Sequence, residues 1–251
     1  MQLVPTRSEP LLHDPDALAV RNIDFYNALW AKTYLTRPER FNTWPLISAL
    51  LPSAPQRLEI GPGLHPRLPI QGTHFIDICH HVITRLNEHQ GLARTGGIAK
   101  LPHASGSFDL VAAFDVIEHV ADDEQVFGEI TRVLKTTGRL IFSVPLHPAR
   151  WTPFDDYVGH ARRYQPTALA ALLDRHGLVV ERSAVFGMQS NNPRLLDHAV
   201  RGLTRHRTIA MHCYNWLFFP LGRLLQKRLI LKYGLMDLSK VDEVLLVCQR
   251  K

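Results

Sequence analysis

Short apolar runs alternate with amphipathic stretches along most of the chain. The run Ser107–Phe114, SFDLVAAF, is almost continuously apolar, which is typical of a strand buried on both faces of a sheet. Asp122–Leu134 instead collects its apolar residues on one face at helical spacing, which predicts an amphipathic helix. Further strands are expected at 56–60, 73–78, 98–101, 139–144, 179–186 and 242–248, and further helices at 16–35, 42–51, 82–91 and, weakened by Pro66 and Pro69, between the first two strands.

This alternation predicts an α/β fold built on a doubly wound, mostly parallel sheet of seven strands, with helices on both faces. The last strand is expected to lie antiparallel at the end of the sheet. Ligands bind at the carboxyl ends of the strands in such sheets. Candidate chemistry is therefore expected in the segments that follow residues 60, 77, 101, 114 and 144.

The same pattern divides the chain into four parts. Residues 1–55 form an arm and a helical cap, and residues 56–188 hold the alternating core. Residues 189–241 are interpreted as a basic helical insertion or lid, and residues 242–251 return to the core as its final strand. We expect the walls of a substrate pocket to come from the N-terminal helices, the segment 145–165 and the insertion.

Composition narrows the class of protein. With 251 residues, 45% hydrophobic and 21% charged, the chain can bury one large core and does not resemble a disordered or fibrous protein. Its cysteines, Cys79, Cys213 and Cys248, are scattered, so we expect no zinc finger and no disulfide framework. The N-terminus lacks the apolar core of a signal peptide, and no stretch reaches the roughly 18 apolar residues of a membrane span. A soluble, cytoplasmic protein is expected, with peripheral membrane contact as an open alternative.

The net charge of +6 is concentrated in one segment. Residues 194–232 carry eight Lys or Arg and one acidic residue, a net charge of +7, which leaves −1 for the rest of the chain. Aromatic residues cluster there too, so 209–233 has two interpretations. It is either a basic amphipathic surface for a membrane or a lipid-linked substrate, or a lid or dimerisation element with solvated arginines. Such local charge argues against nucleic acid binding by the whole protein, and we expect a monomer or a homodimer.

The stretch Arg57–Asp77, RLEIGPGLHPRLPIQGTHFID, organises the sequence. A buried strand leads directly into Gly61 and Gly63, and glycines at that point let the backbone turn tightly and approach a ligand closely. Asp77 ends the next strand beside the same turn, where a carboxylate can accept hydrogen bonds from a ribose diol.

The acid-x-Gly-x-Gly pattern of Glu59, Gly61 and Gly63 resembles motif I of the class I S-adenosylmethionine (SAM) dependent methyltransferases, of the type 11 kind, and Asp77 resembles their ribose-binding acid. The later segments LPHASGSFDLVAAFDVIEHV, EITRVLKTTGRLIFSVP and VGHARRYQPTALAALLDRHGLVVE are similar to further stretches of that family. The resemblance covers roughly residues 57–187. It implies the Rossmann-like methyltransferase fold, SAM as cofactor and S-adenosylhomocysteine (SAH) as product.

The resemblance also implies roles at the cofactor site. Glu59, or the backbone near Gly61 and Gly63, would hold the amino-acid end of SAM or organise the loop. Asp77 would hold the ribose hydroxyls. Phe114 and Asp115 would line the methionine arm.

Two positions depart from the family pattern. His65 stands where a third glycine is common, so either the loop takes a different path or His65 faces the site. Gly97 or Ile98 stands where an adenine-binding acid is usual. Adenine would then pack against Leu101 and the segment around Ile78, with weaker cofactor binding.

Candidate general bases are histidines near the strand ends, because imidazole titrates near neutral pH. They are His119, His147 and His160, and each has the alternative interpretation of a loop-organising residue. Asp155 and Asp156 are adjacent carboxylates, but no third ligand stands at a convincing spacing from them, so no metal is expected.

The leading hypothesis is a SAM-dependent methyltransferase that acts on an oxygen or nitrogen of a small molecule or of an envelope glycan or lipid precursor. One alternative is a non-catalytic binding or scaffold protein that keeps the fold, which His65 and the missing adenine acid favour. An RNA methyltransferase is disfavoured because no NPPY or DPPY tetrad is present. A dehydrogenase that uses NAD is disfavoured because the third glycine of the dinucleotide fingerprint is missing.

Overall fold

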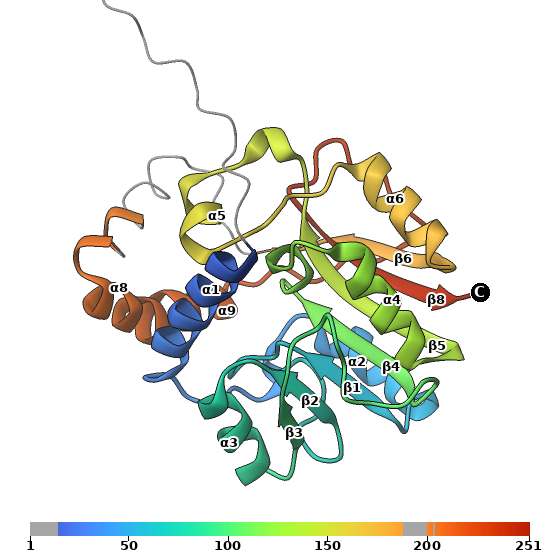
Figure 1. The fold of residues 1–251 in the computed structure, drawn as a ribbon, viewed down its shortest axis with the longest axis horizontal. Helices are drawn as coiled ribbons and strands as arrows, with labels where there is room; N and C mark the ends of the chain where they lie inside the picture. The colour runs from blue at the N-terminus through green and yellow to red at the C-terminus, as the bar shows by residue number, and fades with distance from the viewer. Residues whose placement is uncertain (1–14, 188–199, 203) are drawn as a thin grey trace, which may run out of the picture.

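The computed structural model describes residues 15–187, 200–202 and 204–251, so the expected arm at 1–14 and residues 189–199 of the expected insertion lie outside the described residues. An eight-stranded sheet forms the centre, in the order β3-β2-β1-β4-β5-β8-β6-β7 (Figure 1). Neighbouring strands from β3 to β5 are parallel, and β8 is antiparallel to both β5 and β6. The strands are β1 (Arg57–Ile60), β2 (His74–Asp77), β3 (Leu92–Thr95), β4 (Phe108–Phe114), β5 (Leu134–Pro145), β6 (Leu178–Val185), β7 (Lys232–Tyr233) and β8 (Glu243–Arg250).

Helices bury apolar side chains against both faces of the sheet. On one face, α4 (Asp123–Val133) and α6 (Pro166–Arg175) pack against alternate residues of β4, β5 and β8. On the other face, α2 (Trp44–Leu50) packs against the intervening residues of these strands, and α3 (His80–Glu88) packs against Phe75 of β2. This two-faced burial explains why the central strands are almost continuously apolar.

The remaining helices gather at the carboxyl edge of the sheet. They are α1 (Pro15–Trp30), α5 (Pro153–Val158), α8 (Arg207–Cys213) and α9 (Phe219–Leu224), and a π-helical turn, Tyr214–Phe218, joins the last two. Short 3₁₀ turns lie at Pro38–Arg40, Leu51–Ser53, Ile117–His119 and Pro148–Arg150.

The predicted fold class is confirmed, with corrections at the sheet's edges. The sheet has eight strands because Lys232–Tyr233 pairs with β6. The last strand lies between β5 and β6, not at the end of the sheet. Its residues from Val244 to Cys248 are all buried, and such a strand is most stable with a hydrogen-bonded neighbour on each side.

Four local predictions were wrong. The third strand is Leu92–Thr95, not 98–101, because Gly96 and Gly97 end it before the second apolar run. No helix forms between β1 and β2, where prolines interrupt the chain. The fifth strand begins at Leu134, not at 139, and continues through Gly138. Helix α1 ends at Trp30, earlier than the predicted Leu35.

Candidate active site

The turn after β1 has the left-handed backbone that its glycines predict. Gly61 and Gly63 have φ angles of 61° and 53°. The amide of Gly61 donates to the carbonyl of Ile76 at 2.8 Å, and the amide of Gly63 donates to Oδ2 of Asp77 at 3.0 Å. The turn is therefore fastened to the end of β2, as expected from the sequence.

Asp77 is buried beside this turn and its carboxylate is held from two sides. Oδ1 accepts a hydrogen bond from the amide of Cys79 at 2.8 Å, in addition to the bond from Gly63. Burial raises the pKa of Asp77 to about 6, although these backbone donors act to lower it. The next residue, Ile78, is 40% exposed. A buried carboxylate and an exposed apolar side chain are therefore consecutive at the end of β2, and their contacts with ribose and adenine stay predictions.

Glu59 organises the loop that follows the turn. Its buried carboxylate accepts hydrogen bonds from the amide of Arg67 at 2.8 Å and from the amide of Leu68 at 2.8 Å. Burial raises the pKa of Glu59 to about 7, although the same two amides act to lower it. The two amides would otherwise need acceptors within a helix. Glu59 supplies these acceptors, so the loop is stable in a non-helical conformation. Of the two predicted roles, the structure shows the loop-organising one.

His65 joins the glycine loop to helix α9. Its ring stacks on Phe219 with 3.8 Å between ring centroids, and its Nδ1 lies 3.0 Å from the hydroxyl of Thr36. Burial, with the charge of Arg67 as the next cause, lowers the pKa of His65 to about 3, so the ring is neutral near pH 7. His65, which stands where a third glycine is common, therefore packs against the C-terminal part of the chain.

Helix α1 lies directly on the glycine turn. A Cβ atom added at Gly63 would lie 2.2 Å from the indole of Trp30, and one added at Gly61 would lie 2.5 Å from Val116. Tyr26 stacks beside Trp30, with ring centroids 6.3 Å apart. Both glycines are therefore required by close packing as well as by their φ angles.

The end of β4 faces a small polar cavity. Asp115 has a φ angle of 52°, a strained conformation for a residue other than glycine, and its Oδ1 accepts a hydrogen bond from the hydroxyl of Ser143 at 2.6 Å. Phe114 and Phe186 lie side by side there, with ring centroids 6.0 Å apart. The cavity measures about 40 Å³, enough for a few water molecules. It is lined by Asn42, Arg67, Asp115, Phe186, Gly187 and Gln226.

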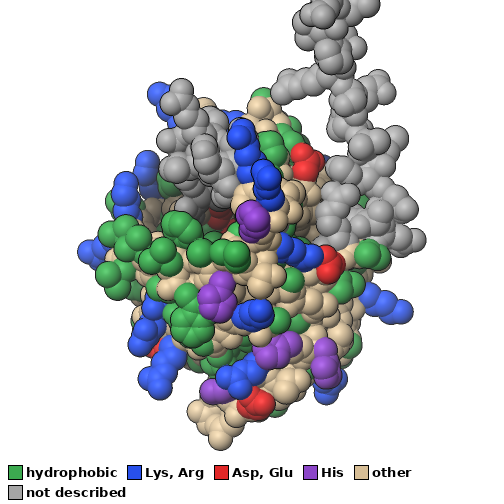
Figure 2. All heavy atoms as spheres, turned by 90° about the vertical axis from the view of Figure 1, so that its left-hand side faces the viewer, with side chains coloured by type: hydrophobic (Ala, Val, Ile, Leu, Met, Phe, Trp, Pro, Cys, Tyr) green, Lys and Arg blue, Asp and Glu red, His purple; other side chains and the backbone are tan. Residues whose placement is uncertain are grey.

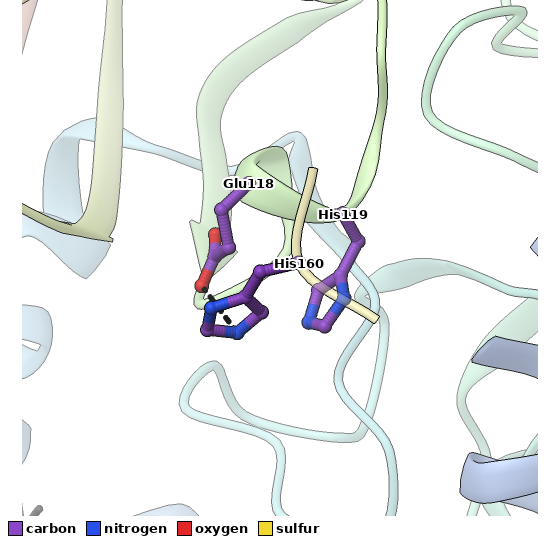
Figure 3. Close-up of side chains that lie close together, drawn as sticks. All are labelled: Glu118, His119 and His160. Carbon is purple, nitrogen blue, oxygen red and sulfur yellow. Dashed lines mark ion pairs between the residues drawn. The ribbon is translucent and has the colours of Figure 1, made fainter. Parts of the chain in front are cut away.

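Two of the three predicted histidines come together after β4 (Figure 3). The rings of His119 and His160 are perpendicular neighbours, 4.7 Å apart, and Glu118 Oε1 lies 3.9 Å from His160 Nε2. His119 Nε2 lies 2.9 Å from the hydroxyl of Tyr26 in α1. Burial, and then His160, lowers the pKa of His119 to about 3, while burial, and then Asp115, raises the pKa of Glu118 well above its ordinary value.

Asp155 fixes the orientation of His160. Its Oδ1 accepts from His160 Nδ1 at 2.8 Å, and its two oxygens accept from Arg163 at 2.8 and 2.9 Å. Burial acts to raise the pKa of Asp155, but the hydrogen bonds from His160, Arg163 and Thr152 hold it well below its ordinary range. Asp155 is thus a positioning residue. Asp155 could be named from the sequence, whereas its partner Arg163, in the GHARRY segment, could not.

The other predicted residues have different surroundings. The ring of His147 donates from Nε2 to the carbonyl oxygen of Leu238 at 2.9 Å. Leu101 and Ile98 are both buried in the main core, so neither presents an open apolar face for adenine. A Cβ at Gly97 would meet no neighbour within 4 Å. That Leu101 packs on adenine stays a prediction, and in this structure Leu101 is 4% exposed.

A larger cleft, with a volume of about 410 Å³, lies between α1, α5 and residues 200–207. This volume suits a small organic ligand. Three segments line it: α1, the segment 145–165 and the start of the C-terminal insertion, which are the ones expected from the sequence. The lining residues are Asp24, Phe25, Pro153, Asp156, Tyr157, Val200, Thr204 and Arg207.

Helices α1, α8 and α9, with the π-helical turn, form one unit that we call the cap. Asn215 donates to the carbonyl of Leu29 at 2.8 Å, and Trp216 donates to the carbonyl of Lys32 at 3.1 Å. The outer face of α8, the turn and α9 is strongly apolar and is bordered by Lys and Arg side chains (Figure 2). Its exposed apolar residues are Ile209, Tyr214, Trp216, Leu217, Phe218, Leu221, Leu224 and Leu225. We call this face the cap surface.

No helix among the described residues is long and apolar enough to cross a membrane. Within the same residues, Cys79, Cys213 and Cys248 are free thiols.

Comparisons with known proteins agree with this geometry. Residues 63–142 match the family model described as "Methyltransferase domain". The chain is 37% identical over 92 residues to a probable SAM-dependent methyltransferase of Mycolicibacterium smegmatis, a match that covers 35% of each protein. A probable SAM-dependent methyltransferase of Mycobacterium tuberculosis is 35% identical over 109 residues, which cover 41% of this chain and 38% of that protein. The chain therefore matches little more than a third of the length of these curated relatives.

Solved structures show the same fold over nearly the whole chain. A SAM-dependent methyltransferase and possible histamine N-methyltransferase of Thermotoga maritima has a TM-score of 0.54 at 15% identity, covering 94% of this chain and 93% of that one. The [4+2]-cyclase SpnF has a TM-score of 0.57 at 13% identity, covering 96% and 97%. Residues 63–142 of this chain thus match a methyltransferase domain, and the chain has the fold of SAM-dependent methyltransferases of known structure.

Proposed function

We propose that the chain transfers the methyl group of SAM to an oxygen or nitrogen atom of a lipid-linked acceptor at a membrane surface. The turn formed by Glu59, Gly61, Gly63 and Asp77 carries the cofactor part of this proposal. When bound, SAM supplies a sulfonium methyl group, and it leaves as SAH. The protein's contribution is to hold the two reactants in line and to handle the proton of the acceptor.

The residues at the turn fit SAM. Asp77 would accept hydrogen bonds from the ribose hydroxyls, and Ile78 would pack against adenine. The glycines would let the cofactor approach the backbone. Because the indole of Trp30 touches Gly63, α1 has to move away from the turn when the cofactor enters. The cap would thus open for SAM and close over the bound complex.

Among the candidate bases, His160 has the most suitable partners. Asp155 accepts a hydrogen bond from Nδ1 of His160. The Nε2 of His160 can therefore receive a proton from the methyl acceptor. The Nε2 of His119 already lies 2.9 Å from the hydroxyl of Tyr26, and the low pKa of His119 makes it a weak base. His147 takes part in a hydrogen bond with the carbonyl of Leu238, which favours a structural role.

The cap surface supports a lipid-linked acceptor. Isolated exposed apolar residues are common on proteins, but here eight lie on consecutive turns, with Trp216 56% and Leu224 82% exposed. Exposed basic residues, Arg205, Lys227 and Arg228, flank them. Apolar side chains beside cations match the interface of an anionic bilayer, which takes up both. The acceptor would then be a membrane component whose polar part reaches the 410 Å³ cleft.

A second candidate function is a binding protein that keeps the fold without methyl transfer. The packing of Trp30 on Gly63 favours it, because that contact closes the turn against a cofactor. The similarity in fold to a protein described as a cyclase shows that this fold also serves other chemistry.

An assay with methyl-labelled SAM distinguishes these proposals. The protein is incubated with a membrane lipid extract, with water-soluble cell extract, or with neither, and SAH and the label are measured in the organic and aqueous phases. We expect SAH and organic-phase label only with the lipid extract. Label confined to the aqueous phase would disprove the lipid-linked acceptor, and no SAH with either extract would favour the binding protein.

A further inference from the structure

Three potential ligand atoms converge after the end of β4 (Figure 3). Glu118 and His119 come from the 3₁₀ turn Ile117–His119, and His160 comes from the loop after α5. One oxygen or nitrogen atom from each side chain lies within 4.8 Å of the other two. An ion with ligands at about 2.0–2.2 Å holds them roughly 3–4 Å apart, so small side-chain rotations would complete a coordination shell.

Both imidazole rings are oriented as metal ligands are. His119 Nδ1 lies 3.0 Å from the carbonyl oxygen of Gly159, and His160 Nδ1 lies 2.8 Å from Oδ1 of Asp155. Both partners are acceptors at neutral pH, so each Nδ1 donates and each Nε2 presents its lone pair. Histidines that bind metals almost always donate the other ring N–H to a carboxylate or a backbone carbonyl. Here both do.

Glu118 supplies a second, independent observation. Its side chain is 1% exposed, and its Oε2 has no hydrogen-bond partner in the part of the chain that the structure describes. The guanidinium of Arg163, whose charge acts on Glu118, is hydrogen-bonded to Asp155. A buried carboxyl oxygen without a partner is rare and destabilising, and a bound cation is one of the few groups that would satisfy it.

We propose that Glu118, His119 and His160 bind one divalent transition-metal ion such as Zn²⁺ or Mn²⁺. Two imidazole nitrogens and one carboxylate suit these ions, whereas Ca²⁺ and Mg²⁺ prefer oxygen ligands throughout. Three protein ligands leave at least one coordination position open. The hydroxyl of Tyr26, which lies 2.9 Å from His119 Nε2, is displaced when the ion binds. No metal was expected from the sequence because Asp155 and Asp156 have no third ligand at a suitable spacing, and in the structure Asp155 instead orients His160.

The site deepens the proposed function and, in this respect, rests on it. The open position would bind an acceptor oxygen and lower its pKa, which favours a hydroxyl acceptor. Both Nε2 lone pairs would then be used for coordination, so His160 would not be the free base. Metal binding itself needs neither SAM nor acceptor, so the site can be tested separately from methyl transfer.

The test is a titration of the full chain, freed of metal by a chelator, with Co²⁺ and then with Zn²⁺. Visible absorption of Co²⁺ reports its ligand geometry, and calorimetry gives the stoichiometry for Zn²⁺. Glu118→Gln keeps the size of the side chain and replaces only the anionic oxygen, and His160→Ala removes a nitrogen ligand. His147→Ala is the matched control, because it removes a histidine outside the cluster. Far-ultraviolet circular dichroism and thermal melts verify that each variant is folded.

We expect one tight site per chain with d–d absorption bands, weakened at least tenfold in Glu118→Gln and His160→Ala and unchanged in His147→Ala. Absence of saturable binding in the wild type would overturn the proposal, and turnover in that same preparation would return His160 to the role of base. Binding that the folded Glu118→Gln variant retains in full would also overturn it. If the wild-type protein binds the metal but transfers no methyl group, that result would count against the proposed function and not against the metal site.

Discussion

Two buried carboxylates in adjacent strands hold the chain that follows β1: Asp77 holds the glycine turn, and Glu59 holds the loop after it. Each accepts hydrogen bonds from two backbone amides, and burial raises the pKa of each. Their positions could be predicted because strand, turn and acid follow one another closely in the sequence. The role of Glu59 could not be decided there, since its partners, Arg67 and Leu68, lie in a loop without a periodic pattern.

The raised pKa of Asp77 predicts a pH dependence of cofactor binding. The ribose hydroxyls donate to an ionised carboxylate, and below pH 6 this carboxyl becomes protonated, so the affinity for SAM should fall as the pH is lowered. We expect up to tenfold weaker binding for each pH unit below about 6. Calorimetric titrations between pH 5 and 8 measure this. Asp77→Asn should bind weakly with no such slope, and an identical slope in that variant would assign the effect to another group.

Glu59 predicts an effect on stability. Glu59→Ala leaves the amides of Arg67 and Leu68 buried without an acceptor, at a cost of about 1–3 kcal/mol for each unsatisfied group. We expect a decrease of about 2–5 kcal/mol in the free energy of unfolding, measured with urea. Asp174→Ala, which removes an exposed acid paired with Lys251, is the control and should change it by less than about 1 kcal/mol. Equal effects would contradict the loop-organising role.

At the scale of elements, the sequence predicted helices and central strands better than edges and contacts. Strand β4 and helix α4 could be predicted because burial imposes a clear period on them. The third strand was misplaced because Leu92–Thr95 is an edge strand with only one buried residue, which leaves little pattern. The packing of α1 on the turn could not be predicted, since Trp30 and Gly63 are far apart in the sequence.

The contact between α1 and the turn predicts unequal effects of two glycine substitutions. Gly63→Ala would place a methyl group against Trp30 and force a left-handed φ on alanine, whereas Gly106→Ala meets only the φ penalty, because nothing lies within 4 Å. We expect Gly63→Ala to lower the free energy of unfolding by about 1–3 kcal/mol more than Gly106→Ala. Urea unfolding measures both. Adding Trp30→Ala should reduce this difference, and an unchanged difference would place the strain elsewhere.

At the scale of the whole molecule, the charge pattern predicted a basic insertion, and the structure shows where its C-terminal helices lie. The C-terminal helices join α1 in the cap, so one unit both covers the cofactor turn and carries the exposed apolar face. Sequence pattern alone left two interpretations of 209–233, because an apolar run beside basic residues does not reveal which side faces solvent. The exposure of Trp216, Leu217 and Phe218 favours the membrane interpretation.

The cap surface predicts binding to anionic lipid vesicles. Apolar side chains and flanking cations both contribute, so cosedimentation should be strong with phosphatidylglycerol vesicles, weak with phosphatidylcholine and reduced by salt. Replacing Trp216, Leu217 and Phe218 with serine should decrease binding at least tenfold. Leu92→Ser and Val179→Ser, which change residues of similar exposure in β3 and β6, should leave it intact. Equal loss in the controls would refute a specific cap surface.

Cofactor binding at the glycine turn is the central claim, and calorimetric titration of the wild type with SAM and SAH tests it most directly. Asp77→Ala and the distant acid variant Asp174→Ala are titrated beside it. We predict saturable binding of one ligand per chain, retained in Asp174→Ala and weakened at least tenfold in a folded Asp77→Ala, since a charged hydrogen bond contributes about 1.5–3 kcal/mol. Absence of binding in the wild type, or equal affinity in Asp77→Ala, would contradict the account.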